Sequence, residues 1–414
     1  MPSLTLTTVW PRWRRVLALA LVLQVCSGDV LAAGKPVTPE EVEGFVDAIS
    51  EAIQKGEVGA YRRLFDLQVF FDRVIQGVDS TPRHQEQFRV GAARGIEQNG
   101  LILASLIDVV AKGGRFEFLR SRSRDKNATA LFRFRTEDER IGYFEIHLDR
   151  SRDGRVRAID YDSYFSGELG SETFRRMYVS LVAYEDRGVI SRFLGKDREF
   201  VDNLSRVKQM TDLVRAGRFA EAEAVRLALP ESVRKRKENL LMAVMIGQDL
   251  DEATYLRAID ELQASLPNDR CIHLHLIDKY TLTKEYDKAL AEVDRLDRSV
   301  GGDPFLDFQR TYLNLEARRF DRARALATKL AKAMPDDYSC RMAIVDVDLK
   351  REDYPAVLRT LKTVDEEFEM GLGELPEDET YGGFVKSPQY QEWLAHVKAR
   401  DARNATAPAP PSNS

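Results

Sequence analysis

Apolar residues recur along this chain with two different periods, and the change of period divides it. Between residues 36 and 114 they recur every three or four positions, which predicts amphipathic helices. From Arg115 to Tyr161 they recur at every second position, which predicts strands. The helical period then returns and continues to the end of the folded chain. The pattern predicts an α+β domain over residues 36–170 and an all-α domain over residues 171–400.

The first domain opens with a helix that carries its own start signal. Thr38 can act as N-cap, Pro39 fits the first helical position, and Glu41 completes a capping box. A second helical stretch passes through Tyr61, and a third covers residues 88–110. Helices therefore occupy the first half of this domain.

Four strands are expected to follow in the same domain. Turn-forming residues at 125–127 and at Asp153–Gly154 separate the alternating runs. The expected inward-facing residues are Phe116, Phe118, Phe132, Phe134, Phe144, Ile146, Leu148, Ile159 and Tyr161. The fold class predicted for this domain is therefore helices plus a four-stranded antiparallel sheet.

This order of helices and curved antiparallel sheet, with the stretch from Glu51 to Asp66, resembles the nuclear-transport-factor-two-like cone, also described as SnoaL-like. The resemblance covers about a third of the chain. It implies a pocket inside the cone, where enzymatic members of the family place an acid or an Asp–His pair. The candidates here are Tyr143, His147, Asp160 and Asp162.

Two interpretations of these polar residues remain. As a base and its orienting partner they would support a hydrolase or an isomerase, and without catalysis the same pocket would serve a small-ligand binder. Alternatively they are structural, because Tyr143, Glu145, His147 and Asp149 alternate with the apolar set and so face away from it. Cross-strand ion pairs would then hold them, with partners among Arg120, Arg122, Arg133 and Arg135.

The second domain shows a regular repeat. An aromatic residue precedes a small one by three positions at Phe219–Ala222, Tyr255–Ala258, Tyr286–Ala289, Phe320–Ala323 and Tyr354–Val357. The aromatic residues lie 36, 31, 34 and 34 positions apart, close to the period of about 34 in tetratricopeptide repeats. The series resembles that family and predicts a solenoid of helical hairpins, although the first-helix Trp and Gly of the family are missing.

The resemblance implies a concave surface built from the first helix of each hairpin, which binds an extended peptide or a partner helix. The groove positions of the family fall here on Asp278, Phe305, Phe308, Tyr312, Met342 and Asp346. The alternative interpretation is that the aromatic residues among them belong to the core between repeats. Near the end, Tyr390, Trp393, Leu394 and Val397 form the apolar face of a capping helix. An Ala-, Pro- and Ser-rich tail over residues 401–414 is expected to be disordered.

The N-terminus follows the layout of a secretory signal. Three arginines at positions 12, 14 and 15 precede an apolar run over residues 16–25, and small residues follow up to Ala33. The run is too short to span a bilayer. We expect a signal peptide over residues 1–33 and export to the bacterial periplasm or beyond the cell, with no membrane span after cleavage.

Candidate chemistry is sparse. A formal net charge of −5 offers nucleic acid no general attraction. Cys271 and Cys340 hold nearly the same place in two hairpins, too far apart for a disulfide, and are expected to be buried thiols. Cys271, His273 and His275 form a C-x-H-x-H string, but on a helix His273 points away from the other two. We therefore expect no metal, no cofactor and no enzyme, but an exported adaptor that binds a protein or peptide partner.

Overall fold

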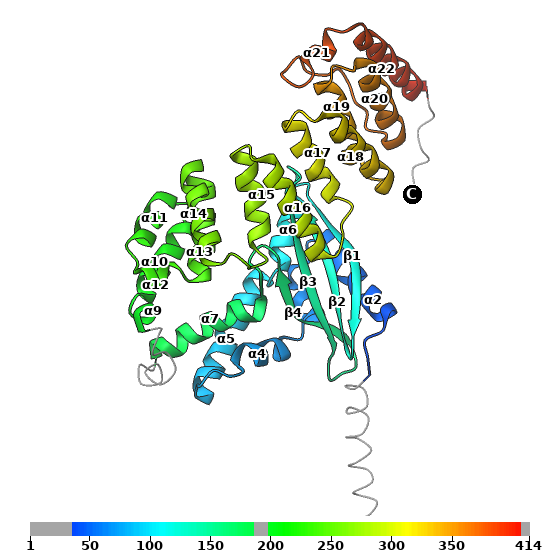
Figure 1. Ribbon diagram of the computed structural model, residues 1–414. Coiled ribbons are helices and arrows are strands. Elements are labelled where there is room, and N and C mark those ends of the chain that lie inside the picture. Colours follow the sequence, from blue (N-terminus) through cyan, green and yellow to red (C-terminus); the bar gives the residue numbers. More distant parts are fainter. Residues whose placement is uncertain (1–34, 186–197, 407–414) are drawn as a thin grey trace, which may run out of the picture. The chain divides into compact units, whose positions relative to one another are not determined.

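The computed structural model describes residues 35–185 and 198–406 (Figure 1). The expected signal peptide lies outside these residues, as do residues 407–414 of the expected tail. Contacts within the chain divide it into two compact units, of which the first ends at Cys271 and the second begins at Ile272. In the described residues, no helix is both long enough and apolar enough to cross a membrane.

The first unit opens with helix α2, Pro39–Gln54, whose predicted start is confirmed. The Thr38 hydroxyl accepts a hydrogen bond from the Glu41 amide at 3.3 Å, and the Glu41 carboxylate accepts one from the Thr38 amide at 3.0 Å. Two donors at the helix terminus are thereby satisfied. The apolar face of α2 is buried from Val42 to Ile53.

Further helices follow before the sheet. They are η1 (Val58–Ala60), α3 (Tyr61–Leu64), α4 (Leu67–Ile75), α5 (Pro82–Asn99) and α6 (Leu103–Ala111). The single helix expected over residues 88–110 is wrong. Gly100 takes a left-handed conformation with φ 62° and ends α5, so that the chain turns before α6.

The sheet has five antiparallel strands in sequence order, one more than the sequence predicts. They are β1 (Arg115–Arg124), β2 (Asn127–Arg135), β3 (Ile141–Arg150), β4 (Val156–Ser163) and β5 (Glu168–Leu169). The fifth strand has only two residues, too few to show an alternation. It pairs with the end of β4, where Asp162 lies opposite Leu169.

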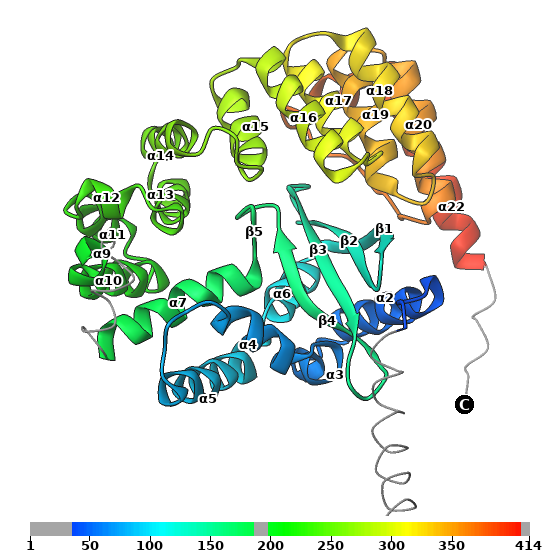
Figure 2. The same ribbon diagram turned by 60° about the horizontal axis from the view of Figure 1, so that its bottom comes forward.

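Helices cover one face of this sheet, as Figure 2 shows for α2, α3 and α6. The core on this side contains Phe132, Ile146 and Leu148 from the strands. Ile159 was expected there, but the pairing of β3 with β4 shifts between His147 and Leu148. That bulge places Ala158 opposite Leu148, and Ala158 joins the helix-side core.

The described remainder of the first unit, residues 170–185 and 198–271, is mainly helical. It comprises α7 (Gly170–Glu185), α9 (Arg198–Asp202), α10 (Leu204–Arg215), α11 (Phe219–Leu227), α12 (Glu231–Arg234), α13 (Lys237–Leu250) and α14 (Glu252–Ser265). Helices α10 and α11 form one hairpin, and α13 and α14 form the next. Helix α7 packs against α4 and β4, because Phe174 and Tyr178 extend the core on the helix side of the sheet.

The second unit consists of three more hairpins and a C-terminal cap. The hairpins are α15–α16 (Ile272–Leu282, Tyr286–Val300), α17–α18 (Leu306–Glu316, Phe320–Ala333) and α19–α20 (Tyr338–Lys350, Tyr354–Phe368). Helices α21 (Gly382–Val385) and α22 (Pro388–Thr406) follow. Within this unit successive hairpins pack side by side, α16 against α17 and α18 against α19 (Figure 1).

The repeat seen in the sequence corresponds to the second helix of every hairpin. The small residue of each pair is at most 2 % exposed, so that each allows a close helix approach; the set is Ala222, Ala258, Ala289, Ala323 and Val357. The uneven spacing at Tyr255 has a local cause. Helix α14 begins at Glu252, three residues before this tyrosine, whereas α16 begins at Tyr286 itself.

The predicted capping helix is present as α22, held by a buried carboxylate. The Arg400 guanidinium donates to both oxygens of Asp365 at 2.6 and 2.7 Å, and His396 Nε2 lies 3.0 Å from the same group. The Leu372 amide donates to it at 2.9 Å. Burial of this carboxyl acts to raise the pKa of Asp365, but the hydrogen bonds from Arg400 and His396 outweigh it and hold the pKa below its usual value.

This lowered pKa predicts an acid-sensitive cap. A carboxyl whose folded-state pKa is depressed contributes stability that is present above the unfolded pKa of about 3.9 and is lost as the pH falls through the folded pKa. We expect α22 to detach on acidification from pH 5 to pH 2. From residue 34 onward Trp393 is the only tryptophan, so its fluorescence measures this step. In Asp365→Asn the cap should be weaker at pH 7 and should respond less to acid; an equal acid response would contradict the assignment.

Candidate functional site

The predicted groove residues of the second unit lie on the first helices of its hairpins, but they differ in burial. Phe305, just before α17, is 0 % exposed and Phe308 is 8 % exposed. Their rings stack at 5.0 Å between centroids, and Phe308 meets Tyr312 at 4.7 Å. The two phenylalanines thus lie in the interior, which agrees with the core interpretation for them.

The other groove residues reach the surface to different extents. Asp278 on α15 is exposed, whereas Tyr312 on α17, and Met342 and Asp346 on α19, are half-buried. The Tyr312 hydroxyl donates to the Asp346 carboxylate at 2.5 Å. Burial raises the pKa of Asp346, and the Tyr312 hydrogen bond opposes that shift. Tyr312 therefore links the first helices of two neighbouring hairpins through a polar contact.

Three of these positions are equivalent in successive hairpins. Asp278, Tyr312 and Asp346 follow one another at the 34-residue spacing of the repeat, on α15, α17 and α19. Met342 lies one turn before Asp346 and packs against the cluster that holds the capping helix. Outside the interior, the predicted groove is therefore a short row of two acids, a tyrosine and a methionine, of which Asp278 is exposed and the other three are half-buried.

A second group of polar side chains lies on the outer face of the sheet, opposite the helix-side core. Glu145 and His147 are two residues apart on β3, and Asp162 on β4 lies directly opposite Glu145. One possible ligand atom from each of the three lies within 4.8 Å of the other two. The Thr129 hydroxyl donates to Glu145 Oε1 at 2.8 Å. The sheet thus brings together an imidazole and two carboxylates.

Asp162 is the most buried member of this group, being 5 % exposed. The guanidinium of Arg270 donates to its Oδ2 atom and lies over the Tyr164 ring, 5.1 Å from the centroid. Burial raises the pKa of Asp162, and the contact with Arg270 opposes this shift. Arg270 was not predicted from the sequence, because it stands between two helices and more than a hundred residues beyond its partner.

Of the two Asp–His combinations that the cone resemblance suggests, His147 lies close to Asp162 but does not pair with Asp160. His147 lies opposite Asp160 in the strand register. The Asp160 carboxylate, however, accepts hydrogen bonds from the amide and hydroxyl of Ser171 and pairs with Arg73 at 3.2 Å. Asp160 is thus a link from β4 to α4 and α7. Tyr143 is fully buried, with its ring against Tyr164.

A hollow of about 740 Å³ opens beside His147 and Glu145. Three cationic side chains of the β1–β2 hairpin line it, namely Arg122, Arg124 and Lys126. Asp125 and Glu145 line the hollow as well, so charges of both signs lie beside His147 on the outer face. This face is opposite to the helix-side face of the sheet, so His147 lies outside a pocket between the sheet and its helices.

Cys271 and His273 of the C-x-H-x-H string each contact a different acidic residue. Burial raises the pKa of the Cys271 thiol to about 12, and its amide donates to Asp269 at 3.1 Å. His273 Nδ1 lies 2.7 Å from the Glu292 carboxylate. A protonated thiol is a poor metal ligand. Cys271 and Cys340 are both buried thiols, as the sequence predicts.

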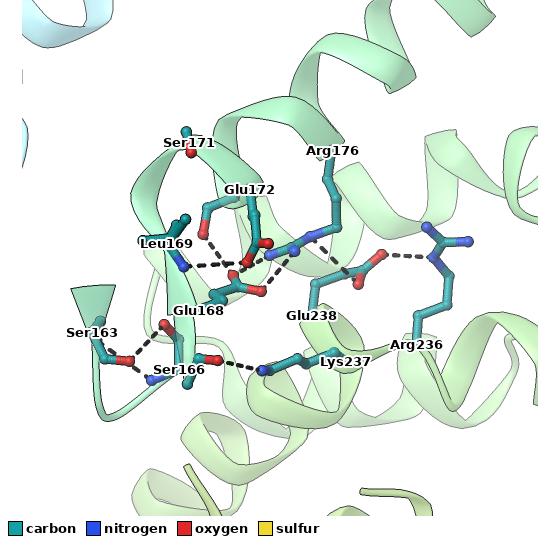
Figure 3. A network of polar contacts seen from close by, with 12 residues as sticks. Ser163, Ser166, Glu168, Leu169, Ser171, Glu172, Arg176, Arg236, Lys237 and Glu238 are labelled. Atoms are coloured by element: carbon teal, nitrogen blue, oxygen red, sulfur yellow. Dashed lines mark hydrogen bonds and ion pairs between the residues drawn. The ribbon is translucent and has the colours of Figure 1, made fainter. Parts of the chain in front are cut away.

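Two members of the basic run over residues 234–237 make specific polar contacts. Arg236 donates to Glu238 at 2.7 Å, and Lys237 donates to the Gly167 carbonyl at 3.1 Å (Figure 3). Glu238 also faces Arg176, which binds Glu168 of β5. The run therefore ties α13 to the edge of the sheet and to the start of α7.

Gly167 permits the close approach on which this contact depends. Its φ of 64° is left-handed, and a Cβ atom there would lie 2.2 Å from the Asp269 carboxylate. Lys237 donates to that same carboxylate at 2.6 Å. The segment before Cys271 is thus fixed against the sheet edge, which is what positions Arg270 over Asp162.

No protein-family model matches this chain, and no curated protein is significantly similar to it. What the chain does must therefore be argued from these two sets of residues.

Proposed function

We propose that this protein is an exported, non-enzymatic adaptor that holds a protein partner along the first helices of its second unit. The observation that carries this proposal is the row formed by Asp278, Tyr312 and Asp346 at equivalent positions of three hairpins. A helical array exposes such a row over several repeats, and an extended segment can contact all of it.

The chemistry of the row indicates the kind of partner. Two carboxylates flank the tyrosine, and Met342 adds a flexible apolar side chain beside it. A partner segment that carries a Lys or Arg next to an apolar residue complements this surface in charge and in polarity. We therefore propose a basic, partly apolar peptide segment as the occupant.

The finer assignments belong to the same proposal. We propose that the hairpins are tetratricopeptide-like, which is supported by the buried small residue in each second helix. We propose that the α+β region is a nuclear-transport-factor-two-like cone, which is supported by its helices on one face of an antiparallel sheet. Export to the periplasm or beyond is proposed from the Arg-rich and apolar N-terminus.

Site-specific photo-crosslinking tests the adaptor proposal. A photo-reactive amino acid is placed at position 278 in the exported chain, and crosslinked proteins are identified by mass spectrometry. The matched control places it at Asp321 on α18, which is highly exposed but belongs to a second helix. We expect a defined partner from position 278 and none of it from position 321.

The contribution of the row itself is tested with the photo-reactive amino acid moved to position 342, because position 278 then carries the side chain that is varied. Tyr312→Phe removes only the hydroxyl that binds Asp346, and Asp278→Lys reverses one charge. Asp278→Lys should weaken the binding of a basic partner by about tenfold or more, because the new lysine repels the partner's positive charge. Crosslinks that are equal at positions 278 and 321, or a partner insensitive to Asp278→Lys, would overturn the proposal.

A further inference from the structure

Two polar atoms of the outer-face group are buried without a hydrogen-bond partner. They are His147 Nε2 and Asp162 Oδ1. Such atoms are rare in folded proteins, and each needs an explanation, of which a bound ion is one. Both belong to residues that, with Glu145, bring their ligand atoms within 4.8 Å of one another. The orphaned atoms and the clustering are independent observations that indicate the same place.

Neighbouring side chains orient the carboxylates of Glu145 and Asp162, but a cationic side chain donates only to Asp162. Arg270 uses Oδ2 of Asp162 and leaves Oδ1, while Thr129 holds Glu145 through Oε1. Hydrogen bonds of this kind fix ligand orientation around metal ions. Glu145 and Asp162 lie directly opposite each other on adjacent strands, where two like charges repel. A cation between them removes that repulsion.

We propose that Glu145, His147 and Asp162 bind a divalent first-row transition metal ion, with Zn²⁺ as the probe of choice. One imidazole with two carboxylates is a donor set that suits Zn²⁺, whereas Mg²⁺ and Ca²⁺ prefer oxygen ligands alone. Ligand atoms of a tetrahedral Zn²⁺ site lie about 3.4 Å apart, given bonds of about 2.1 Å.

The site has an open side. Glu145 and His147 line the hollow whose other walls include Arg122, Arg124 and Lys126. Three protein ligands leave at least one coordination position of a tetrahedral ion for a further ligand. An ion held here would accept a small anionic ligand, such as a carboxylate or a phosphate, from the hollow. This inference does not depend on the adaptor proposal, because it concerns residues of the first unit only.

Zn²⁺ binding by the purified chain, with a tag that contains no histidine, tests the site. Isothermal titration and metal analysis after dialysis should give one Zn²⁺ per chain in the wild type. Co²⁺ should bind with the visible absorption of a low-coordinate nitrogen and oxygen site. We expect His147→Gln, Glu145→Gln and Asp162→Asn each to weaken Zn²⁺ binding by about 100-fold or more. Mg²⁺ at the same concentration should not compete.

Two controls separate the site from general metal binding. Asp149→Asn changes a carboxylate two residues beyond His147 on the same strand, and His273→Gln removes an imidazole that Glu292 already engages. Both should bind Zn²⁺ as the wild type does. Circular dichroism verifies that each variant folds. Glu145→Gln is the variant expected to disturb folding least, because the Glu145 side chain is half-buried. A wild type that binds no Zn²⁺, or three variants that bind it unchanged, would overturn the proposal.

Discussion

Replacement of Trp393 by alanine is expected to release helix α22 from the end of the second unit. Trp393 is 0 % exposed, and its indole Nε1 donates to the Gly373 carbonyl at 3.0 Å. It packs in a cluster with Leu361 of α20 and Phe384 of α21. Truncation of a fully buried aromatic side chain costs about 3–5 kcal/mol, which exceeds what a terminal helix can lose and stay docked.

Hydrogen exchange read by mass spectrometry checks this expectation element by element. In Trp393→Ala the amides of α22 should lose most of their protection, whereas those of the first unit should be unchanged. The matched control is Leu394→Ala on the same helix, because Leu394 is only partly buried and should have a small effect. Full protection of α22 in the variant would show that the Asp365 contacts hold it without the indole.

Replacement of Glu223 by glutamine is expected to destabilise the helical part of the first unit by about 3 kcal/mol. Arg226 is 2 % exposed, and it donates to both oxygens of Glu223 at 2.7 and 2.8 Å. Glu261 of α14 binds the same guanidinium at 2.9 Å but is partly exposed. Loss of the Glu223 charge leaves a buried guanidinium with only this weaker partner, and a buried charge without full compensation is costly.

A double variant separates the charge effect from packing. Glu223→Leu with Arg226→Met removes both charges and keeps similar volume, so it should be far less destabilising than Glu223→Gln. On the same helix, Glu221→Gln breaks an exposed ion pair with Arg218. It should leave the free energy of unfolding, measured in urea, unchanged. Equal destabilisation of the single and double variants would contradict a role for buried charge.

Much of the fold could be predicted because its signals are local. The capping box at Thr38 involves residues three positions apart, and the hydrophobic period separates helices from strands within one window. The hairpin repeat could be counted because each hairpin buries one small residue, such as Ala289 or Ala323, at the equivalent position. These features depend on residues that are close together in the sequence. They can therefore be recognised from the sequence alone.

Other features were missed because nothing in the local sequence marks them. The turn inside three hairpins uses a left-handed residue that is not glycine, at Lys284, Arg318 and Glu352, with φ between 57° and 58°. A residue other than glycine rarely adopts this conformation, so the local sequence does not predict it. The bulge beside Ile159 and the two-residue strand β5 likewise follow from strand pairing rather than from alternation.

The candidate sites divide in the same way. The row at Asp278, Tyr312 and Asp346 follows from the repeat period, so it could be predicted from the sequence. That Phe305 and Phe308 are buried, and so do not belong to the surface, is seen only in the structure.

The sequence by itself determined the order of helices and strands, the hairpin period and the face of β3 that bears His147, because these depend on residues close together in the chain. Only the tertiary structure decided that Asp160 turns to Ser171 and Arg73, and that Asp162 meets Arg270. The physical reason is that a buried charge is satisfied by whatever partner the packed elements bring to it, at any distance in sequence.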